Sequence, residues 1–317
     1  MDNVKTGIVV LNYNTPEETL KCVESIRKYT SIRYKIFVVD NKSTDDSAEK
    51  LSKRLKEQCD VQFIQSSKNG GYSAGNNIGV KAAIEDKCDV IYIMNSDVEL
   101  TEDALTRMNK VLLSNDKYMI IGPRVINNDG NDTQVARKKV TLKTFIFSRH
   151  PFVYFRIFDK ISNRKCNHSG HKVFSFDGCV MGCCLGVRAS DFERIKYFDE
   201  NIFLYGEESI LTYKMEKLDK LAVYDKGTKI WHKESISTKK RGNAFIQFHS
   251  WNSGMYILKN YCKASRIALI LIAIWNSITW ISFSIVSAKH RSMLKDFIHT
   301  DWRIALSSRN NILDSIS

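Results

Sequence analysis

Short apolar runs alternate with segments of helical periodicity through the N-terminal third of the chain. Such runs, bounded by polar residues, are typical of buried strands. Strands alternating with helices at this spacing predict βαβ units and a mainly parallel sheet, whose right-handed crossovers bring the strand carboxyl ends to one edge. The predicted strands are 5–11, 35–40, 61–65 and 90–94; the predicted helices are 16–29, one carrying Ala48, Leu51 and Leu55, and one from the loop 69–77 to about Glu85.

The regular alternation of predicted strands and helices ends after Val125. A basic and aromatic segment is followed by an apolar stretch at 174–187, a helix ending near Leu218, and two short strands at 221–224 and 229–232. A chain of 317 residues can hold one large α/β domain with an appendage. We therefore predict an α/β fold with a mainly parallel central sheet flanked by helices over residues 1–235, followed by a C-terminal helical region over 236–317.

Polar clusters follow the ends of four predicted strands. A carboxylate at the carboxyl end of a parallel strand lies where such sheets bind ligands. Asp97 is a hard oxygen donor that suits Mg²⁺ or Mn²⁺ carrying a diphosphate. Alternatively, Asp97 caps a following helix whose first turn holds Glu99, Glu102 and Asp103. The four clusters are Asn12-Tyr13-Asn14, Asp40-Asn41, the loop Asn69–Asn77 and Asn95-Ser96-Asp97.

The loop at 69–77 contains adjacent glycines, Gly70 and Gly71. Without a Cβ atom, glycine lets the backbone approach a ligand closely, although many such loops are plain turns. The loop lacks the Gly-Lys-Ser/Thr of a Walker loop and does not read GxGxxG. Binding of ATP or of a dinucleotide therefore loses its main support.

Two further candidates for chemistry lie downstream. Glu207 and Glu208 are adjacent, and repulsion between them near a bound anion should raise the pKa of one carboxyl, which makes it a candidate general base. The alternative is a pair of ordinary helix N-terminal acids. His232 ends a predicted strand and is a candidate second ligand for the cation held by Asp97, or else a structural histidine.

The net charge of +13 is concentrated in one segment. Residues 137–172 hold ten Lys or Arg against a single acid, Asp159, and therefore carry +9 of the total. Six aromatic residues are interleaved with these charges. An anionic membrane surface or a diphosphate-bearing lipid suits such a segment, as does nucleic acid, and a solvated basic face is the remaining alternative.

Cysteine usage and the N-terminus indicate a reducing compartment. The eight cysteines form no disulfide framework. The cluster Cys166–His171 lacks the second ligand pair of a zinc finger. The apolar run Gly7–Leu11 is too short for a signal peptide, so we expect the chain to start in the cytosol.

Residues 267–288 form an uncharged stretch of 22 residues, long enough to cross a bilayer. Polar residues dilute its second half, and Trp275 and Trp280 would lie near the membrane centre although Trp prefers the interface. Cationic residues flank both sides, so orientation is not readable. We expect a membrane-inserted or monotopic segment, with a full span or a buried helix as alternatives.

The order of these motifs resembles the family 2 glycosyltransferases with the GT-A fold, and most of all the rhamnosyltransferase-like polysaccharide enzymes. The resemblance covers about residues 5–235. Its pieces are Leu11-Asn12-Tyr13-Asn14, Val38–Asp45, Asn69–Asn77, Asn95-Ser96-Asp97-Val98, Phe198-Asp199-Glu200, Phe203–Glu208 and Trp231-His232.

The resemblance implies an inverting transfer from a nucleoside-diphosphate sugar, with Mg²⁺ or Mn²⁺ as cofactor. Asn95-Ser96-Asp97 is similar to the family's Asp-X-Asp site, with Asn in place of the first acid. Asp97 would hold the metal with His232, and Asp40 would recognise the base and ribose. Donor binding is assigned to Asn12, Tyr13, Asn14, Asp40, Asn69, Gly70, Gly71, Asn76, Asn95 and Ser96.

The implied catalytic base is Glu208, which stands where the family has Asp, with Glu207 as the fallback. Ile210 stands where many members carry another acid. These two departures keep open a catalytically inactive scaffold that binds membrane or RNA. A sugar-1-phosphate nucleotidyltransferase would need a glycine-rich, basic loop directly after the first strand, where this chain has Asn12–Pro16.

The expected protein is thus a glycosyltransferase of bacterial surface polysaccharide synthesis, such as capsule or O-antigen. It would act at the cytoplasmic face of the cell membrane as a peripheral or monotopic enzyme. Its expected partners are a dTDP- or UDP-linked sugar, a lipid-linked glycan acceptor and the anionic membrane surface, with no nucleic acid. The identity of the sugar, the acceptor linkage and the oligomeric state are not readable from the sequence.

Overall fold

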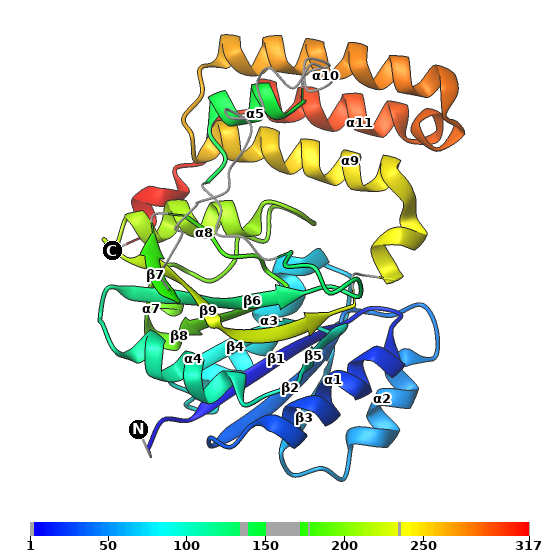
Figure 1. Cartoon of the computed structure of the whole chain (residues 1–317). Coiled ribbons are helices and arrows are strands. Elements are labelled where there is room, and N and C mark those ends of the chain that lie inside the picture. Colours follow the sequence, from blue (N-terminus) through cyan, green and yellow to red (C-terminus); the bar gives the residue numbers. More distant parts are fainter. Residues whose placement is uncertain (1–2, 134–138, 150–171, 177, 234–235, 317) are drawn as a thin grey trace.

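A computed structural model describes residues 3–133, 139–149, 172–176, 178–233 and 236–316. Within these ranges, nine strands form one mixed sheet in the order β3-β2-β1-β4-β8-β6-β9-β5, with β7 paired to β9 (Figure 1). The strands are β1 (Thr6–Asn12), β2 (Tyr34–Asp40), β3 (Val61–Gln65), β4 (Val90–Asn95), β5 (Val98–Leu100), β6 (Tyr118–Ile126), β7 (Val173–Phe176), β8 (Cys184–Arg188) and β9 (Leu221–His232).

The N-terminal half of the sheet confirms the predicted βαβ pattern. Strands β3, β2, β1 and β4 are parallel neighbours, and Asn12 pairs with Asp40 while Leu11 pairs with Asn95. The central residues of β2, β1 and β4 are buried on both faces, which explains why these strands read as continuous apolar runs. The helices between them are α1 (Pro16–Tyr29), α2 (Ser47–Leu55) and α3 (Gly71–Glu85).

The C-terminal half of the sheet contains antiparallel pairs and departs from the prediction in two places. Residues 98–100 form strand β5, antiparallel to β9, which was not predicted, and the alternative in which Asp97 caps a helix holding Glu99 and Glu102 is therefore wrong. Helix α4 (Ala104–Leu113) begins later, and the side chain of Asp103 caps it by accepting from Thr106 N. Residues 221–232 form one long strand, with register shifts against β6, where two short strands were expected.

Three helices after the sheet form a layer of their own, at the top of Figure 1. They are α9 (Ile236–Asn260), which is kinked at Gly242, α10 (Arg266–Val286) and α11 (Ala288–Leu306). Aromatic stacking of Trp280 on Phe297, with ring centroids 4.0 Å apart, joins α10 to α11. The expected C-terminal helical region is therefore present. The remaining helices are α5 (Leu142–Arg149), α7 (Ala189–Arg194), α8 (Glu207–Glu216) and the 3₁₀ turn Ile312–Ser315.

Helix α10 is, in the part of the chain that the structure describes, the one helix long and apolar enough to cross a membrane. Only 28% of its most apolar window is buried. Most of the basic and aromatic segment 137–172 lies outside the described residues, as does the cluster Cys166–His171. The described part of that segment includes α5, in which Phe145 is buried.

Candidate active site

The pairing of β5 with β9 brings Asp97 and His232 together. Val98 lies opposite His232 in the sheet, and Lys233 N donates to the carbonyl of Asp97. The Nε2 atom of His232 lies 3.1 Å from Oδ1 of Asp97, and both side chains are about nine-tenths buried. The geometry is not that of a hydrogen bond, so Nε2 lacks a hydrogen-bond partner among the described residues. A carboxylate oxygen and an imidazole nitrogen are thus left side by side.

These two side chains fit a divalent cation held jointly with a ligand. The described residues contain no group of three or more His, Cys, Asp or Glu side chains that would hold a metal by themselves. Mg²⁺ in nucleotide sites commonly takes one or two carboxylates and completes its shell with substrate phosphates and water. The Asp97 carboxylate meets that requirement for Mg²⁺ or Mn²⁺, and the buried Nε2 of His232, 3.1 Å from it and without a hydrogen-bond partner among the described residues, is available beside it as a nitrogen ligand.

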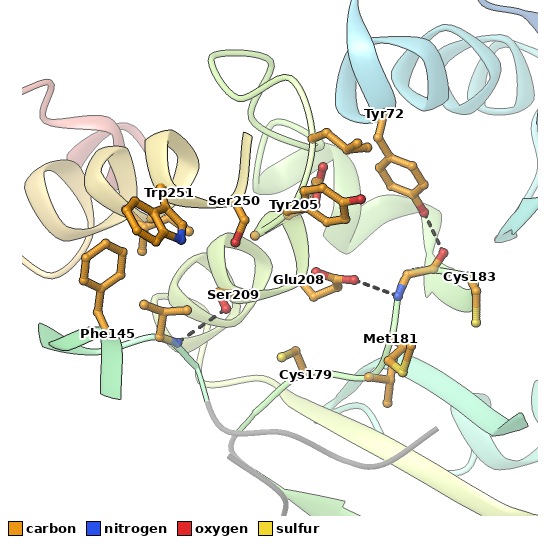
Figure 2. A pocket seen from close by; sticks show the side chains of 18 of the residues that line it. Tyr72, Phe145, Cys179, Met181, Cys183, Tyr205, Glu208, Ser209, Ser250 and Trp251 are labelled. Carbon is orange, nitrogen blue, oxygen red and sulfur yellow. Dashed lines mark hydrogen bonds between the residues drawn. The ribbon is translucent and has the colours of Figure 1, made fainter. Parts of the chain in front are cut away.

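A cavity of about 650 Å³ connects this edge of the sheet to the C-terminal helices. His232 and Asn95 line it from the sheet, and Glu208 lines it from α8. Figure 2 shows Glu208 between the rings of Trp251 and Phe145 on one side and Met181 and Cys183 on the other. The charges of Asp97 and Glu208 both contribute to raising the pKa of the buried Cys183 thiol, after burial itself and the charge of Cys184. Cys183 is therefore near both predicted functional acids.

A hydrogen bond from the backbone amide of Gly182 holds the Glu208 side chain at the cavity. Its Oε1 accepts from Gly182 N at 2.9 Å, and the hydroxyl of Tyr72 donates to Gly182 O at 2.6 Å. A Cβ atom at position 182 would lie 3.0 Å from Oε1 of Glu208, so glycine permits the close contact. Glu208 remains partly exposed to the cavity. An acceptor hydroxyl can therefore reach its carboxylate.

Glu207 differs from its neighbour in being buried. Its side chain is 5% exposed, and Oε1 has no hydrogen-bond partner among the described residues. Burial, followed by the charge of Glu208, raises the pKa of Glu207 to about 8. Burial thus favours the protonated form of Glu207, and Glu208 is the carboxylate of the pair that is exposed to the cavity.

Ile210 has a packing role in this chain. It is fully buried in an apolar cluster with Tyr256, Ile257 and Tyr261. The cluster joins α8 to α9. An acid at this position would lie among apolar side chains, which explains why isoleucine fits here.

Asp40 is buried at the end of β2 and organises the neighbouring loops. Its carboxylate accepts from Asn12 Nδ2 at 2.8 Å and from Ser43 N at 3.1 Å. Ser43 Oγ accepts from Asn14 N at 3.0 Å, so the loops after β1 and β2 are joined. Ser96 joins the same edge through Thr15, whose hydroxyl lies 3.0 Å from that of Ser96. The predicted donor-binding residues of three strand ends thus form one connected network.

The glycine-rich loop is shaped by contact with the chain itself. Gly71 has φ +85°, and a Cβ atom there would lie 2.1 Å from the carbonyl oxygen of Phe203. Tyr72 N donates to the same oxygen at 2.9 Å. A Cβ atom on Gly70 would meet its own helix at Ala74. The close approach at Gly71 is thus to the segment that leads to Glu208, and donor binding by Gly70 and Gly71 stays a prediction.

The other residues predicted from this loop take two positions. Asn69 accepts from Asn41 Nδ2 at 3.1 Å and lines a second cavity of about 600 Å³ together with Tyr13 and Asn14. Asn76 is fully buried and donates to Tyr72 O at 3.0 Å. Of the two predicted residues, Asn69 therefore lines a cavity, whereas Asn76 supports the backbone of the loop.

Helix α9 contributes a wall of the main cavity that the motifs did not predict. Ser250, Trp251, Gly254 and Ile257 all face it. Trp251 is also packed edge-on against Trp280 and Phe297, so the three C-terminal helices support this wall. An aromatic residue in a long helix is usually a core residue. The sequence of α9 therefore gives no indication that this helix lines a functional site.

A glycosyltransferase family model matches this chain, and two related proteins are glycosyltransferases as well. The model described as Glycosyl transferase family 2 matches residues 7–194. The chain is 25% identical over 218 residues to the low-salt glycan biosynthesis hexosyltransferase Agl10 of Haloferax volcanii, covering 67% of this chain and 61% of that protein. It is 30% identical over 126 residues to the glycosyltransferase GlyG of Streptococcus pneumoniae, covering 40% of each chain. The chain thus spans less than two thirds of either relative.

Solved structures show the same fold. GalNAc-T7, solved with UDP, GalNAc and Mn²⁺, superposes with a TM-score of 0.60 at 14% identity, over 81% of this chain and 48% of that one. The mannosyltransferase PcManGT from Pyrobaculum calidifontis, solved with GDP-Man and Mn²⁺, gives 0.51 at 12% identity, over 98% of this chain and 72% of that one. At these identities the likeness concerns the fold alone, which is the expected GT-A arrangement.

Proposed function

Because the chain belongs to glycosyl transferase family 2, we propose that it is a metal-dependent, inverting glycosyltransferase. It would move a sugar from a nucleoside diphosphate to a hydroxyl of a surface-glycan acceptor. One observation carries this proposal. His232, with the Asp97 carboxylate 3.1 Å away, lines the same cavity as Glu208. A diphosphate-binding group and a proton acceptor are then available to one donor sugar.

Asp97 and His232 are the residues that would hold Mg²⁺ or Mn²⁺ in this proposal. When bound, the ion would neutralise charge on the departing nucleoside diphosphate. Asn95 ends β4 and Ser96 lies in the turn that follows, and Asp40 and Asn12 lie at the ends of the neighbouring strands. The donor's nucleotide would therefore lie across the carboxyl ends of β1, β2 and β4.

Glu208 would accept the proton of the acceptor hydroxyl. The freed oxygen attacks the anomeric carbon from the face opposite the leaving diphosphate, so one C–O bond forms as the other breaks and the configuration inverts. Gly182 N keeps the carboxylate in place, and the protonated neighbour Glu207 adds no second negative charge. General-base assistance of this kind commonly contributes about 10²- to 10⁴-fold to the rate.

The donor we propose is a dTDP- or UDP-linked hexose or deoxyhexose, with rhamnose as the first candidate. The motif resemblance supports rhamnose, and the Agl10 relative is named a hexosyltransferase. The acceptor we propose is a glycan on a lipid diphosphate of capsule or O-antigen synthesis. Phe145, from the basic and aromatic segment, lines the same cavity as Glu208, which supports a role of that segment in acceptor binding.

We also propose attachment to the cytoplasmic face of a bacterial membrane through α10. Its buried face carries Asn276, which donates to Asp301 of α11, so the helix is anchored to the protein along one side. This arrangement favours a monotopic or peripheral attachment over a full span. The opposite side is an apolar stripe at helical spacing, formed by Ile267, Leu271, Ile274, Trp275, Ile278, Ile281 and Ile285, all exposed.

The domain division proposed from the sequence, 1–235 and 236–317, separates the family motifs from the helical layer. Helix α9 nevertheless lines the main cavity. We therefore propose that the C-terminal region takes part in acceptor binding as well as in membrane attachment. Full-length protein is the form to assay.

The test is release of nucleoside diphosphate from a panel of nucleotide sugars, with dTDP-rhamnose and UDP-hexoses first. Each is assayed with Mn²⁺, with Mg²⁺ and with EDTA. We expect one donor to be consumed and EDTA to abolish its consumption. Equal release with EDTA would refute metal dependence, and no release from any donor would favour the inactive scaffold.

A further inference from the structure

Another cavity, of about 450 Å³, lies on the far side of α9 from the candidate active site. We call it the α9–α11 cavity. The two cavities lie along different faces of α9. Ser250 and Gly254 line the active-site cavity, whereas Asn252 and Lys259 line the α9–α11 cavity. Its walls come from α9, α11, residues 201–203 and the segment 307–310. It shares no lining residue with the active-site cavity.

Asn252 presents an unsatisfied amide to the α9–α11 cavity. Its side chain is 8% exposed, yet neither Oδ1 nor Nδ2 has a hydrogen-bond partner among the described residues. Buried amides are nearly always hydrogen-bonded, because leaving them unpaired costs their full desolvation. An amide in this state, facing a cavity, is suited to a bound polar ligand.

The charges around this cavity are positive. Lys259 is 6% exposed and donates to Ser307 Oγ, and Arg303 stands exposed at the rim. The described lining residues include no Asp or Glu. The nearby carboxylate of Asp199 is engaged by the hydroxyls of Tyr256 and Tyr261. Burial, and then the charge of Arg309, lowers the pKa of Lys259, so an anion beside it would stabilise its charged form.

We propose that the α9–α11 cavity binds a phosphate group, with Lys259 and Arg303 supplying charge and the Asn252 amide supplying a donor. A phosphate has several acceptor oxygens and a charge that matches two cations. The hydroxyls of Ser307 and Thr300 line the same cavity and complete a set of donors. The ligand is either a soluble phosphate compound or the headgroup of a lipid.

The bound phosphate would lie against the segment that leads to Glu208. Phe203 lines the α9–α11 cavity, and its carbonyl accepts from Tyr72 N of the glycine-rich loop. Ser253, also in the lining, donates to Leu204 O at 2.9 Å. Occupancy would therefore brace residues 203–204 from the side opposite the active site. The proposal itself does not depend on which reaction the active site performs.

The first experiment measures binding of inorganic phosphate to the full-length protein by isothermal titration calorimetry at low ionic strength. Arg303→Gln and Lys259→Met should each weaken binding at least about tenfold, because each removes a charge-assisted hydrogen bond. Lys295→Gln is the matched control, since Lys295 is an exposed cation of α11 outside the cavity lining. Its affinity should equal that of the unaltered protein.

The second arm uses phosphatidylcholine vesicles with and without phosphatidic acid. A headgroup ligand predicts that Arg303→Gln and Lys259→Met reduce binding to the acidic vesicles more than Lys295→Gln does. A soluble ligand predicts the loss in the calorimetric arm alone. If all three variants match one another in both arms, the proposal is overturned. Arg303 is exposed, so its variant keeps the test decisive should Lys259→Met fail to fold.

Discussion

At the scale of single residues, the side chains of the two adjacent glutamates, Glu207 and Glu208, lie in different environments. Glu208 is partly exposed and held by Gly182 N, whereas Glu207 is buried with a pKa of about 8. The sequence shows two identical acids in one helical turn and does not reveal which is buried. The orientation of α8 against α9, fixed in part by buried Ile210, decides that difference.

The raised pKa of Glu207 predicts a pH dependence of stability. Between its ordinary value of 4.5 and about 8, the folded protein keeps a proton that the unfolded chain releases. Its contribution to stability is therefore full at low pH and is lost as pH rises through that window, by up to about 1.4 kcal/mol per pH unit. Glu207→Gln carries no such proton, so we expect it to gain stability over the unaltered protein as pH rises.

Urea unfolding at pH 5.5 and pH 8.5 measures this difference. The exposed Glu57→Gln is the matched control, because the same chemical change there should leave the difference from the unaltered protein nearly constant. A constant difference for Glu207→Gln as well would show that residue 207 is ionised in the folded protein at neutral pH.

At the scale of elements, apolar runs located the parallel strands, and their polar ends located most of the candidate site. What the sequence did not predict depends on pairing between distant segments. Strand β5 is only three residues long and exists because it pairs with β9, which also brings His232 to Asp97. Helix α9 reaches the cavity through packing of Trp251 against α10 and α11, which local periodicity cannot report.

The contact between the glycine-rich loop and Phe203 predicts a specific intolerance at position 71. Gly71→Ala places a Cβ atom 2.1 Å from Phe203 O in a residue with φ +85°, so the loop must move. We expect a loss of about 3 kcal/mol or more in the free energy of unfolding. Chemical denaturation measures it, and nucleoside-diphosphate release should fall with it because Phe203 leads to Glu208.

Gly130→Ala is the control for backbone strain. Gly130 has φ +76° but open space where a Cβ atom would stand. It should cost only about 1 kcal/mol, the penalty of the left-handed conformation. Equal losses in the two variants would mean that the close contact with Phe203 has no energetic weight.

At the scale of the whole molecule, the helical layer has two faces with different tasks. One face of the layer closes the candidate active site through α9, and the outer face of α10 displays the apolar stripe. The sequence predicted a membrane-seeking segment here from its lack of charge. It did not predict that the same layer lines the site, because that follows from the packing of α9 beside α8.

The stripe predicts membrane binding that depends on the exposed side chains of α10. Leu271→Gln combined with Ile278→Gln should reduce flotation with anionic vesicles roughly tenfold, because both side chains are more than half exposed and available to lipid. Donor consumption in solution should be unchanged. Ser282→Gln, at an exposed polar position of the same helix, is the control. Unchanged flotation of the double variant would remove α10 from membrane attachment.

The central claim is that Asp97, next to His232 at the cavity, serves the diphosphate while Glu208, in the lining of the same cavity, serves the acceptor. The direct measurement compares Asp97→Asn with Glu208→Gln in two assays, Mn²⁺-dependent binding of the donor's nucleoside diphosphate and sugar transfer. We predict that Asp97→Asn loses both activities. Glu208→Gln should keep nucleotide binding and lose transfer by about 100-fold or more. Metal-dependent transfer surviving in Asp97→Asn, or full transfer in Glu208→Gln, would contradict the account.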